Sequence, residues 1–345
     1  MNHNKNIIIF ILTAFTTLFI YILAYLYQLG RGVDAEWWVL NVTQKKMNIA
    51  DNNKENRLLI ISGSNAMFGF DSYKLSHLIN KNVINLSIHA GLDISYYRMM
   101  LDNTVVKGDV VIMPLEYIYY SREDEYSDWH INNMIAWGHD YLNWIPVWKK
   151  IEFFSHVSFQ RVLKGLLSEK KTNTDSYSNV IKYKNDEGTY KGYNYTSLNN
   201  KGDINRFNYT SPDVIEYIQQ PDKHDEELSY YINDYKNVTT YAKTELLKIK
   251  KLIEGRGGVL YLSWPTTMKS KYFNRYNKHA LYLVHSIKDQ LSPLGFTFLC
   301  DPFYANLEQS YFLDTNYHLN GNGAKKRSEY FAQCYNNKQS SIINK

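Results

Sequence analysis

Three side chains in the sequence are of the types that carry out nucleophilic acyl transfer. Ser64 lies in the run Ile-Ser-Gly-Ser-Asn, directly after a short apolar segment. Asp314 and His318 lie four residues apart in the run from Phe312 to Gly323. A serine nucleophile needs a base that takes its proton, and the base needs an acceptor that fixes its tautomer. The sequence therefore supplies all three groups, although each motif taken alone is equally typical of a turn or a helix cap.

Short apolar runs predict the strands that would position these residues. They lie at Leu58–Ser62, Val83–Leu86, Asp109–Pro114, Val259–Ser263 and Phe296–Leu299. Continuous apolar runs of this length are typical of parallel strands that are buried on both faces. Amphipathic stretches predict helices over 73–79, 94–103, 239–254, 278–291 and 323–335, the first of them capped by Asp71. This alternation predicts an α/β domain with a mainly parallel sheet and its site at the carboxyl ends of the strands.

The alternation is interrupted between about residues 117 and 237. Residues 130–167 are rich in tryptophan and apolar side chains and are expected to be helical, whereas residues 170–206 are polar and predict a long loop. We therefore expect a large insertion between the third and fourth strands.

The N-terminal region contains one segment of membrane-spanning length. The 21 residues from Ile7 to Tyr27 carry no charge and would form a helix of about 30 Å, the thickness of a bilayer core. A cleaved secretion signal is the alternative, but the apolar run is long for one and no clear small-x-small cleavage site follows. The expected organisation is a tail (1–6), a transmembrane helix (7–27), a connector (28–56) and an enzyme-like domain (57–345) with the insertion at 117–237.

Composition and charge exclude several classes of protein. The net charge of +5, from 39 Lys+Arg and 34 Asp+Glu, gives no compact basic stripe, and we expect no nucleic-acid partner. The two cysteines, Cys300 and Cys334, exclude a disulfide scaffold and a four-cysteine zinc site, and the sequence leaves open whether they pair. No ligand set at metal spacing and no phosphate loop is evident, so we expect neither a metal nor another cofactor.

Taken together, the first-strand Gly-Ser and the late Asp-x-x-x-His-Leu-Asn run resemble the SGNH (GDSL-like) hydrolase superfamily. The likeness is greatest to its single-pass, membrane-anchored branch, which includes the alginate O-acetylation proteins and the teichoic-acid D-alanylation protein. The resemblance implies a three-layer α/β/α, flavodoxin-like domain. It also implies Ser64 as nucleophile, His318 as general base, Asp314 as its orienting acid, and the amides of Ser64 and Gly91 as oxyanion donors.

The sequence departs from the superfamily pattern in its third block. A Gly-x-Asn-Asp is usual there, whereas this chain reads Met-Pro-Leu-Glu-Tyr from residue 113. A carboxylate at Glu116 accepts hydrogen bonds and does not stabilise an oxyanion, and loss of one donor costs about 10²–10³ in rate. Slow chemistry is therefore expected. Residues beside the motifs are candidate substrate contacts, namely Asn65, Glu116, Tyr117 and Asn320.

The predicted function is acyl transfer to, or removal from, a cell-envelope polysaccharide through an acyl-enzyme on Ser64. The resemblance implies a multi-span membrane-bound O-acyltransferase as partner and acyl donor. The polymer would lie outside the cytoplasm, and so would the domain, although Lys5 before the span and Arg31, Lys45 and Lys46 after it do not favour that orientation. The alternative is a catalytically degenerate SGNH fold that binds polymer or acts as a scaffold.

Overall fold

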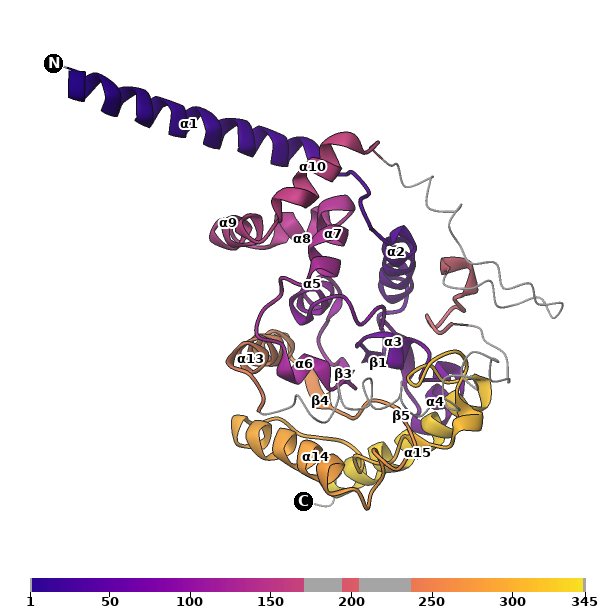
Figure 1. Ribbon diagram of the computed structural model, residues 1–345. Helices are drawn as coiled ribbons and strands as arrows, with labels where there is room; N and C mark the ends of the chain where they lie inside the picture. The colour runs from indigo at the N-terminus through magenta and orange to yellow at the C-terminus, as the bar shows by residue number, and fades with distance from the viewer. Residues whose placement is uncertain (1, 171–193, 205–236, 344–345) are drawn as a thin grey trace. The chain divides into compact units, whose positions relative to one another are not determined.

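The structure is a computed structural model that describes residues 2–170, 194–204 and 237–343 (Figure 1). The chain forms two compact units. The first comprises residues 1–40 and 126–178, and the second residues 41–125 and 179–345. Much of the predicted 117–237 insertion lies outside the described residues.

The second unit is an α/β structure around a parallel sheet. Its strands are β1 (Arg57–Ile60), β2 (Asn82–Asn85), β3 (Val110–Met113) and β4 (Val259–Leu262), in the order β2-β1-β3-β4. All neighbouring pairs are parallel, as the continuous apolar runs predict. The predicted fifth strand is reduced to a single parallel bridge between Phe298 and Leu262. A separate two-stranded sheet pairs β5 (Thr267–Met268) with β6 (Asn306–Leu307).

Helices pack on the sheet because its strands are apolar on both faces. Alternate strand residues, including Leu58, Val83 and Ile112, form one core cluster with side chains of α4 (Ser72–Ile79) and α15 (Gly321–Ile343). A second helix pair, α5 (Ile94–Thr104) and α13 (Thr240–Gly255), is held together along its length, and α13 packs on β4. α14 (Lys278–Leu291) and the Asp71 cap of α4, whose carboxylate accepts from Lys74 N–H at 3.0 Å, agree with the sequence prediction.

A buried ion pair lies at the amino ends of the strands. Arg57 begins β1 and Asp109 precedes β3, and both side chains are almost fully buried. Arg57 Nε donates to Asp109 Oδ1 at 2.9 Å, and the guanidinium also donates to the carbonyls of Ala50 and Thr104. The ion pair therefore links the start of β1 to the start of β3. The two carbonyl contacts link Arg57 to the segment before β1 and to the end of α5.

The first unit consists of helices. α1 (Asn2–Gln28) is long and apolar enough to cross a bilayer, a property that it shares with secretion signals. Four shorter helices follow in sequence from residue 128: α7 (Asp128–Ala136), α8 (His139–Trp144), α9 (Val147–Ser155) and α10 (Phe159–Leu167). The helical prediction for residues 130–167 is thus confirmed.

Candidate functional site

The candidate site lies at the carboxyl ends of β1 and β3. Here the order in which successive strands are added to the sheet changes from one side of β1 to the other. The connection from β1 leads to β2 on one side, and the connection from β2 leads to β3 on the other side of β1. In open parallel sheets a crevice forms at such a switch point, outside the strand ends. Ser64 follows β1 and Glu116 follows β3, so the sheet itself brings these two segments together.

Ser64 is the first residue of α3 (Ser64–Met67), a single helical turn that is separated from the end of β1 by three residues. The residue is half-buried, whereas its neighbours Gly63 and Asn65 are buried. Among the described residues, neither its hydroxyl nor its backbone N–H makes a hydrogen bond. Both groups are therefore open to a ligand.

Asp314 and His318 form the hydrogen-bonded pair that their spacing predicts. His318 Nδ1 lies 2.8 Å from Asp314 Oδ1, and both side chains are largely buried. The loop between them is closed by the Leu313 N–H, which donates to the His318 carbonyl, and by the Thr315 hydroxyl, which accepts from His318 N–H at 3.1 Å. The carboxylate thus holds the Nδ1 side of the ring, which leaves Nε2 as the atom that can exchange a proton.

Phe68 connects the histidine to the helix of the serine. The rings of Phe68 and His318 are stacked, with centroids 4.2 Å apart and planes at 14°. Phe68 donates its backbone N–H to the Ser64 carbonyl and so lies one helical turn beyond it, on the same face. His318 therefore lies one side chain away from Ser64, although no hydrogen bond joins them in the described structure. Catalytic hydrogen bonds are often long before substrate binds.

The Glu116 carboxylate accepts hydrogen bonds from backbone amides of the turn that contains Ser64. Its carboxylate accepts from Gly63 N–H at 3.2 Å, from Asn65 N–H at 3.1 Å and from the Ser62 hydroxyl at 3.0 Å. The side chain is only 3% exposed, and a Cβ on Gly63 would lie 2.3 Å from its Oε1. Glu116 therefore shapes the serine turn in this structure, and its role as a substrate contact stays a prediction.

Replacement of Glu116 by glutamine tests this bracing role. The amide keeps one acceptor oxygen but directs an NH₂ group at a backbone donor, so at least one buried N–H loses its partner. We expect the free energy of unfolding to fall by about 1–3 kcal/mol, measured by urea unfolding of the detergent-solubilised chain. The exposed Glu123 offers a matched control, since its change to glutamine should leave stability within about 0.5 kcal/mol. Equal effects of the two variants would contradict the assignment.

Arg327 is a buried charge that the sequence did not single out. It is fully buried on α15, donates to the Asn65 carbonyl at 2.9 Å and to the Trp264 carbonyl at 2.9 Å, and stacks its guanidinium 4.3 Å from the Phe70 ring centre. Glu116 therefore accepts hydrogen bonds from backbone N–H groups at the start of α3, and Arg327 donates to a backbone carbonyl of the same turn. The sequence signal was weak because Arg327 follows Lys325 and Lys326, a run that is typical of a solvated helix face.

The predicted oxyanion donor Gly91 is already engaged. Its N–H donates to His89 Nδ1 at 2.9 Å. The neighbouring carbonyls of Ala90 and Leu92 accept from the Tyr119 hydroxyl at 3.0 and 2.9 Å and from the Arg122 guanidinium. This loop is held from both sides, and the role of Gly91 as an oxyanion donor stays a prediction that would require its N–H to leave His89.

The other predicted substrate contacts are also buried and used by the protein. The Asn65 amide donates to the Pro114 carbonyl at 3.0 Å, and the Asn320 amide donates to the Ser310 carbonyl at 2.8 Å. Asn320 also accepts from Gly323 N–H and so caps α15. Tyr117 is 2% exposed, and burial raises the pKa of its phenol well above the usual value. The two amides therefore brace the protein, whereas the Tyr117 hydroxyl is buried without a hydrogen-bond partner among the described residues, and contact of these three side chains with substrate stays a prediction.

A cavity of about 1050 Å³ lies beside α15 in the same unit. Its lining includes Tyr276, Tyr304 and Tyr330 together with Lys271 and Lys326. Lys326 Nζ donates a hydrogen bond to the Tyr311 hydroxyl at 3.1 Å, and this bond raises the pKa of Lys326, so the ammonium stays charged at neutral pH.

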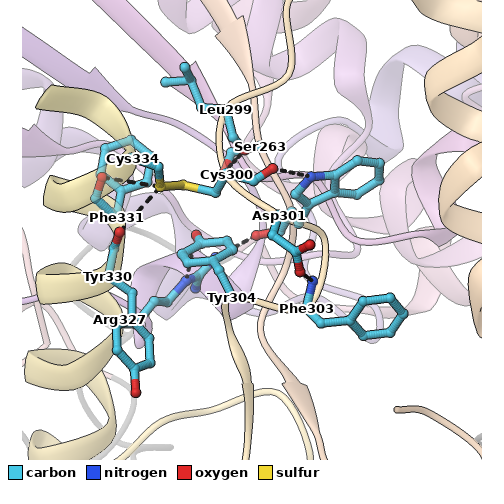
Figure 2. The surroundings of a disulfide bond; sticks show 11 residues. Ser263, Leu299, Cys300, Asp301, Phe303, Tyr304, Arg327, Tyr330, Phe331 and Cys334 are labelled. Carbon is cyan, nitrogen blue, oxygen red and sulfur yellow. Dashed lines mark hydrogen bonds between the residues drawn. A yellow bond between two sulfur atoms is a disulfide. The ribbon is translucent and has the colours of Figure 1, made fainter. Parts of the chain in front are cut away.

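A disulfide joins the two walls of this cavity. Cys300, after the Phe298 bridge, is bonded to Cys334 on α15, with Cα atoms 5.3 Å apart (Figure 2). Asp301 and Tyr304 follow Cys300, while Tyr330 precedes Cys334 on the helix, and all of them line the cavity. Closing a loop of this length stabilises a fold by about 3–4 kcal/mol. The pairing that the sequence left open is therefore present.

Within the described ranges no three His, Cys, Asp or Glu side chains come together as metal ligands. No protein-family model matches the chain, and no curated protein sequence resembles it significantly.

Proposed function

We propose that the chain is a membrane-anchored, serine-dependent acyltransferase or esterase of the SGNH type, acting on a cell-envelope polysaccharide. The observation that carries this proposal is the Asp314–His318 pair, stacked through Phe68 against the helical turn that begins with Ser64. The three groups come from two distant parts of the sequence, and the stack of His318 on Phe68 supports their approach near the switch point of the parallel sheet, where ligands bind in such folds.

The proposed reaction has two steps. Ser64 Oγ attacks the acyl carbonyl of a donor while His318 Nε2 takes its proton, and the leaving group departs with that proton as the acyl-enzyme forms. A sugar hydroxyl, or water, then attacks the acyl-enzyme and gives its proton to His318, which returns it to Ser64. Asp314 stabilises the imidazolium in both steps. The free Ser64 N–H is the oxyanion donor that the described residues offer, so we expect slow turnover.

The cavity beside α15 supports a polysaccharide acceptor. Tyrosine rings pack on the apolar faces of sugar rings, and the lysines suit acidic substituents. The Cys300–Cys334 disulfide supports a location outside the cytoplasm, because structural disulfides persist in oxidising compartments. A partner such as a multi-span membrane O-acyltransferase would supply the acyl group, as the resemblance implies.

Labelling of the full chain with a fluorophosphonate tests the proposal. We expect Ser64 to be modified in the wild type, and Ser64→Ala and His318→Ala to lose the label. Ser155 is a matched control, because its hydroxyl lies 3.5 Å from His156 Nδ1 on the surface of α9 without a carboxylate behind the ring. Ser155→Ala should label fully. A folded wild type that stays unlabelled would overturn the proposal.

A scaffold without catalysis is the second candidate, and two observations favour it. Glu116 fills two amides of the serine turn, and the Gly91 amide is bonded to His89. A degenerate enzyme of this kind would bind polymer in the α15 cavity but neither take up the fluorophosphonate nor hydrolyse a small acetyl ester.

A further inference from the structure

The first unit carries an exposed apolar surface on two neighbouring helices. On α9, Val147, Trp148 and Ile151 are 71%, 61% and 66% exposed, and on α10, Phe159 and Leu167 are 64% and 90% exposed. Soluble proteins seldom expose so many large apolar side chains in one region, and such surfaces mark contacts with proteins or lipids.

These side chains form one face of each helix. At 100° per residue, positions 147, 148 and 151 fall within about 100° of arc, and so do positions 159, 163, 166 and 167. The opposite faces are buried, through Phe153 on α9 and through Arg161 and Gly165 on α10. Both helices are therefore amphipathic, with their apolar faces uncovered in the described structure.

Both helices are attached to the carboxyl-terminal end of α1 (Figure 1). The Phe154 ring lies 4.1 Å from that of Tyr25 and 5.5 Å from that of Tyr21. Arg161 on α10 donates to the Gln28 side chain at 2.9 Å and to the Arg31 carbonyl at 3.0 Å. A Cβ on Gly165 would lie 2.8 Å from Gln28 Cβ, so α10 approaches α1 as closely as a glycine permits.

The attachment point sets the depth of α9 relative to α1. The apolar run of α1 ends at Tyr27, six residues beyond Tyr21, which at 1.5 Å per residue is about 9 Å. If that run spans the bilayer core, Phe154 lies within about 9 Å of its edge. Amphipathic helices that lie in the plane of a membrane bury their apolar faces about 5–10 Å into the same zone.

The charges on these helices fit an anionic lipid surface. Lys150 and Lys164 flank the apolar faces, Lys164 with Asp34 at 3.6 Å, whereas Lys149 forms an ion pair at 2.9 Å with Glu152, the one carboxylate in the two helical segments. Lys149 Nζ lies 5.2 Å from the Trp148 ring centre. Tryptophan beside lysine is typical of the membrane–water interface, where the ring is half-immersed and the ammonium reaches the headgroups.

We infer that α9 and α10 lie in the interface of the bilayer that α1 crosses, with the apolar face of each helix inserted among the acyl chains of an anionic membrane. This inference rests on the proposed membrane anchor and not on the chemistry at Ser64. It gives the first unit three points of membrane contact instead of one, and so restricts the rotation and tilt of α1.

Nitroxide labels on the full chain, reconstituted into phosphatidylcholine with a minority of phosphatidylglycerol, test the inference. The two native cysteines are bonded to each other, so Ile151→Cys and Leu163→Cys provide unique thiols on exposed positions. Leu12→Cys serves as the bilayer reference and the exposed Glu123→Cys as the water reference. Power saturation with oxygen and with a nickel chelate then gives the depth of each label.

We expect the labels at 151 and 163 to collide with oxygen more than with nickel, at depths of about 5–10 Å below the phosphates. Nickel access equal to that of the Glu123 reference would overturn the inference, because the face would then lie in water. If neither oxygen nor nickel reached these labels when the protein was highly diluted in lipid, the inference would also be overturned. A second copy of the chain would then cover the apolar faces. Nickel access at position 12 would show that the anchor itself is absent and the inference with it.

Discussion

Replacing His318 with alanine is expected to lower the rate of hydrolysis of a small acetyl ester by about 10³–10⁴-fold. The variant removes the ring that stacks on Phe68, one helical turn beyond Ser64, and with it the group proposed to take the serine proton. Asp314→Asn should cause a loss of similar size, because an amide at 2.8 Å from Nδ1 allows the wrong tautomer of the ring. Initial rates with p-nitrophenyl acetate measure both effects.

The exposed His279 is the matched control for this experiment. It lies on α14, and its change to alanine should leave the rate unchanged. If His318→Ala hydrolyses the ester as fast as the wild type while both proteins unfold at the same temperature, the Asp314–His318 pair is not the acid–base machinery.

The second large effect concerns stability. Asp109→Asn is expected to lower the free energy of unfolding by about 3–5 kcal/mol, because it leaves the Arg57 guanidinium buried without a counter-charge. Urea unfolding of the detergent-solubilised chain, followed by circular dichroism, measures the change.

The Lys250–Glu254 pair on α13 provides the comparison, since Glu254 is half exposed and the pair lies at helical spacing. Glu254→Gln should cost no more than about 0.5 kcal/mol. Because the Arg57–Asp109 pair lies at the amino ends of the strands, Asp109→Asn should still take up the fluorophosphonate at temperatures where it is folded. A loss below 1 kcal/mol for Asp109→Asn would show that water reaches the pair.

The strands and helices of the second unit could be predicted because their signals are local. A buried parallel strand is a continuous apolar run, and β1 to β4 each match one within a residue or two. The run at 296–299 is also apolar but makes only one bridge, to Leu262. Strand pairing depends on how the neighbouring strand is placed, which the composition of the run does not reveal.

The hydrogen bond between Asp314 and His318 could be predicted for the same reason. Asp314 and His318 are close in sequence, so their spacing was informative. The role of Glu116 depends on the pairing of β1 with β3, which brings residue 116 beside residue 63, and no local pattern reveals it. Arg327 contacts Asn65 across more than 250 residues of sequence. Long-range contacts of this kind decide which polar side chains face a ligand and which brace the fold.

The distance along the chain between Ser64 and its base also orders events during synthesis. Asp314 leaves the ribosome about 250 residues after Ser64, which at 5–20 residues per second corresponds to roughly 10–50 s. Throughout that interval the nascent chain holds Ser64 without His318. The proposed nucleophile is therefore without its proposed base until the last segment of the chain folds onto Phe68.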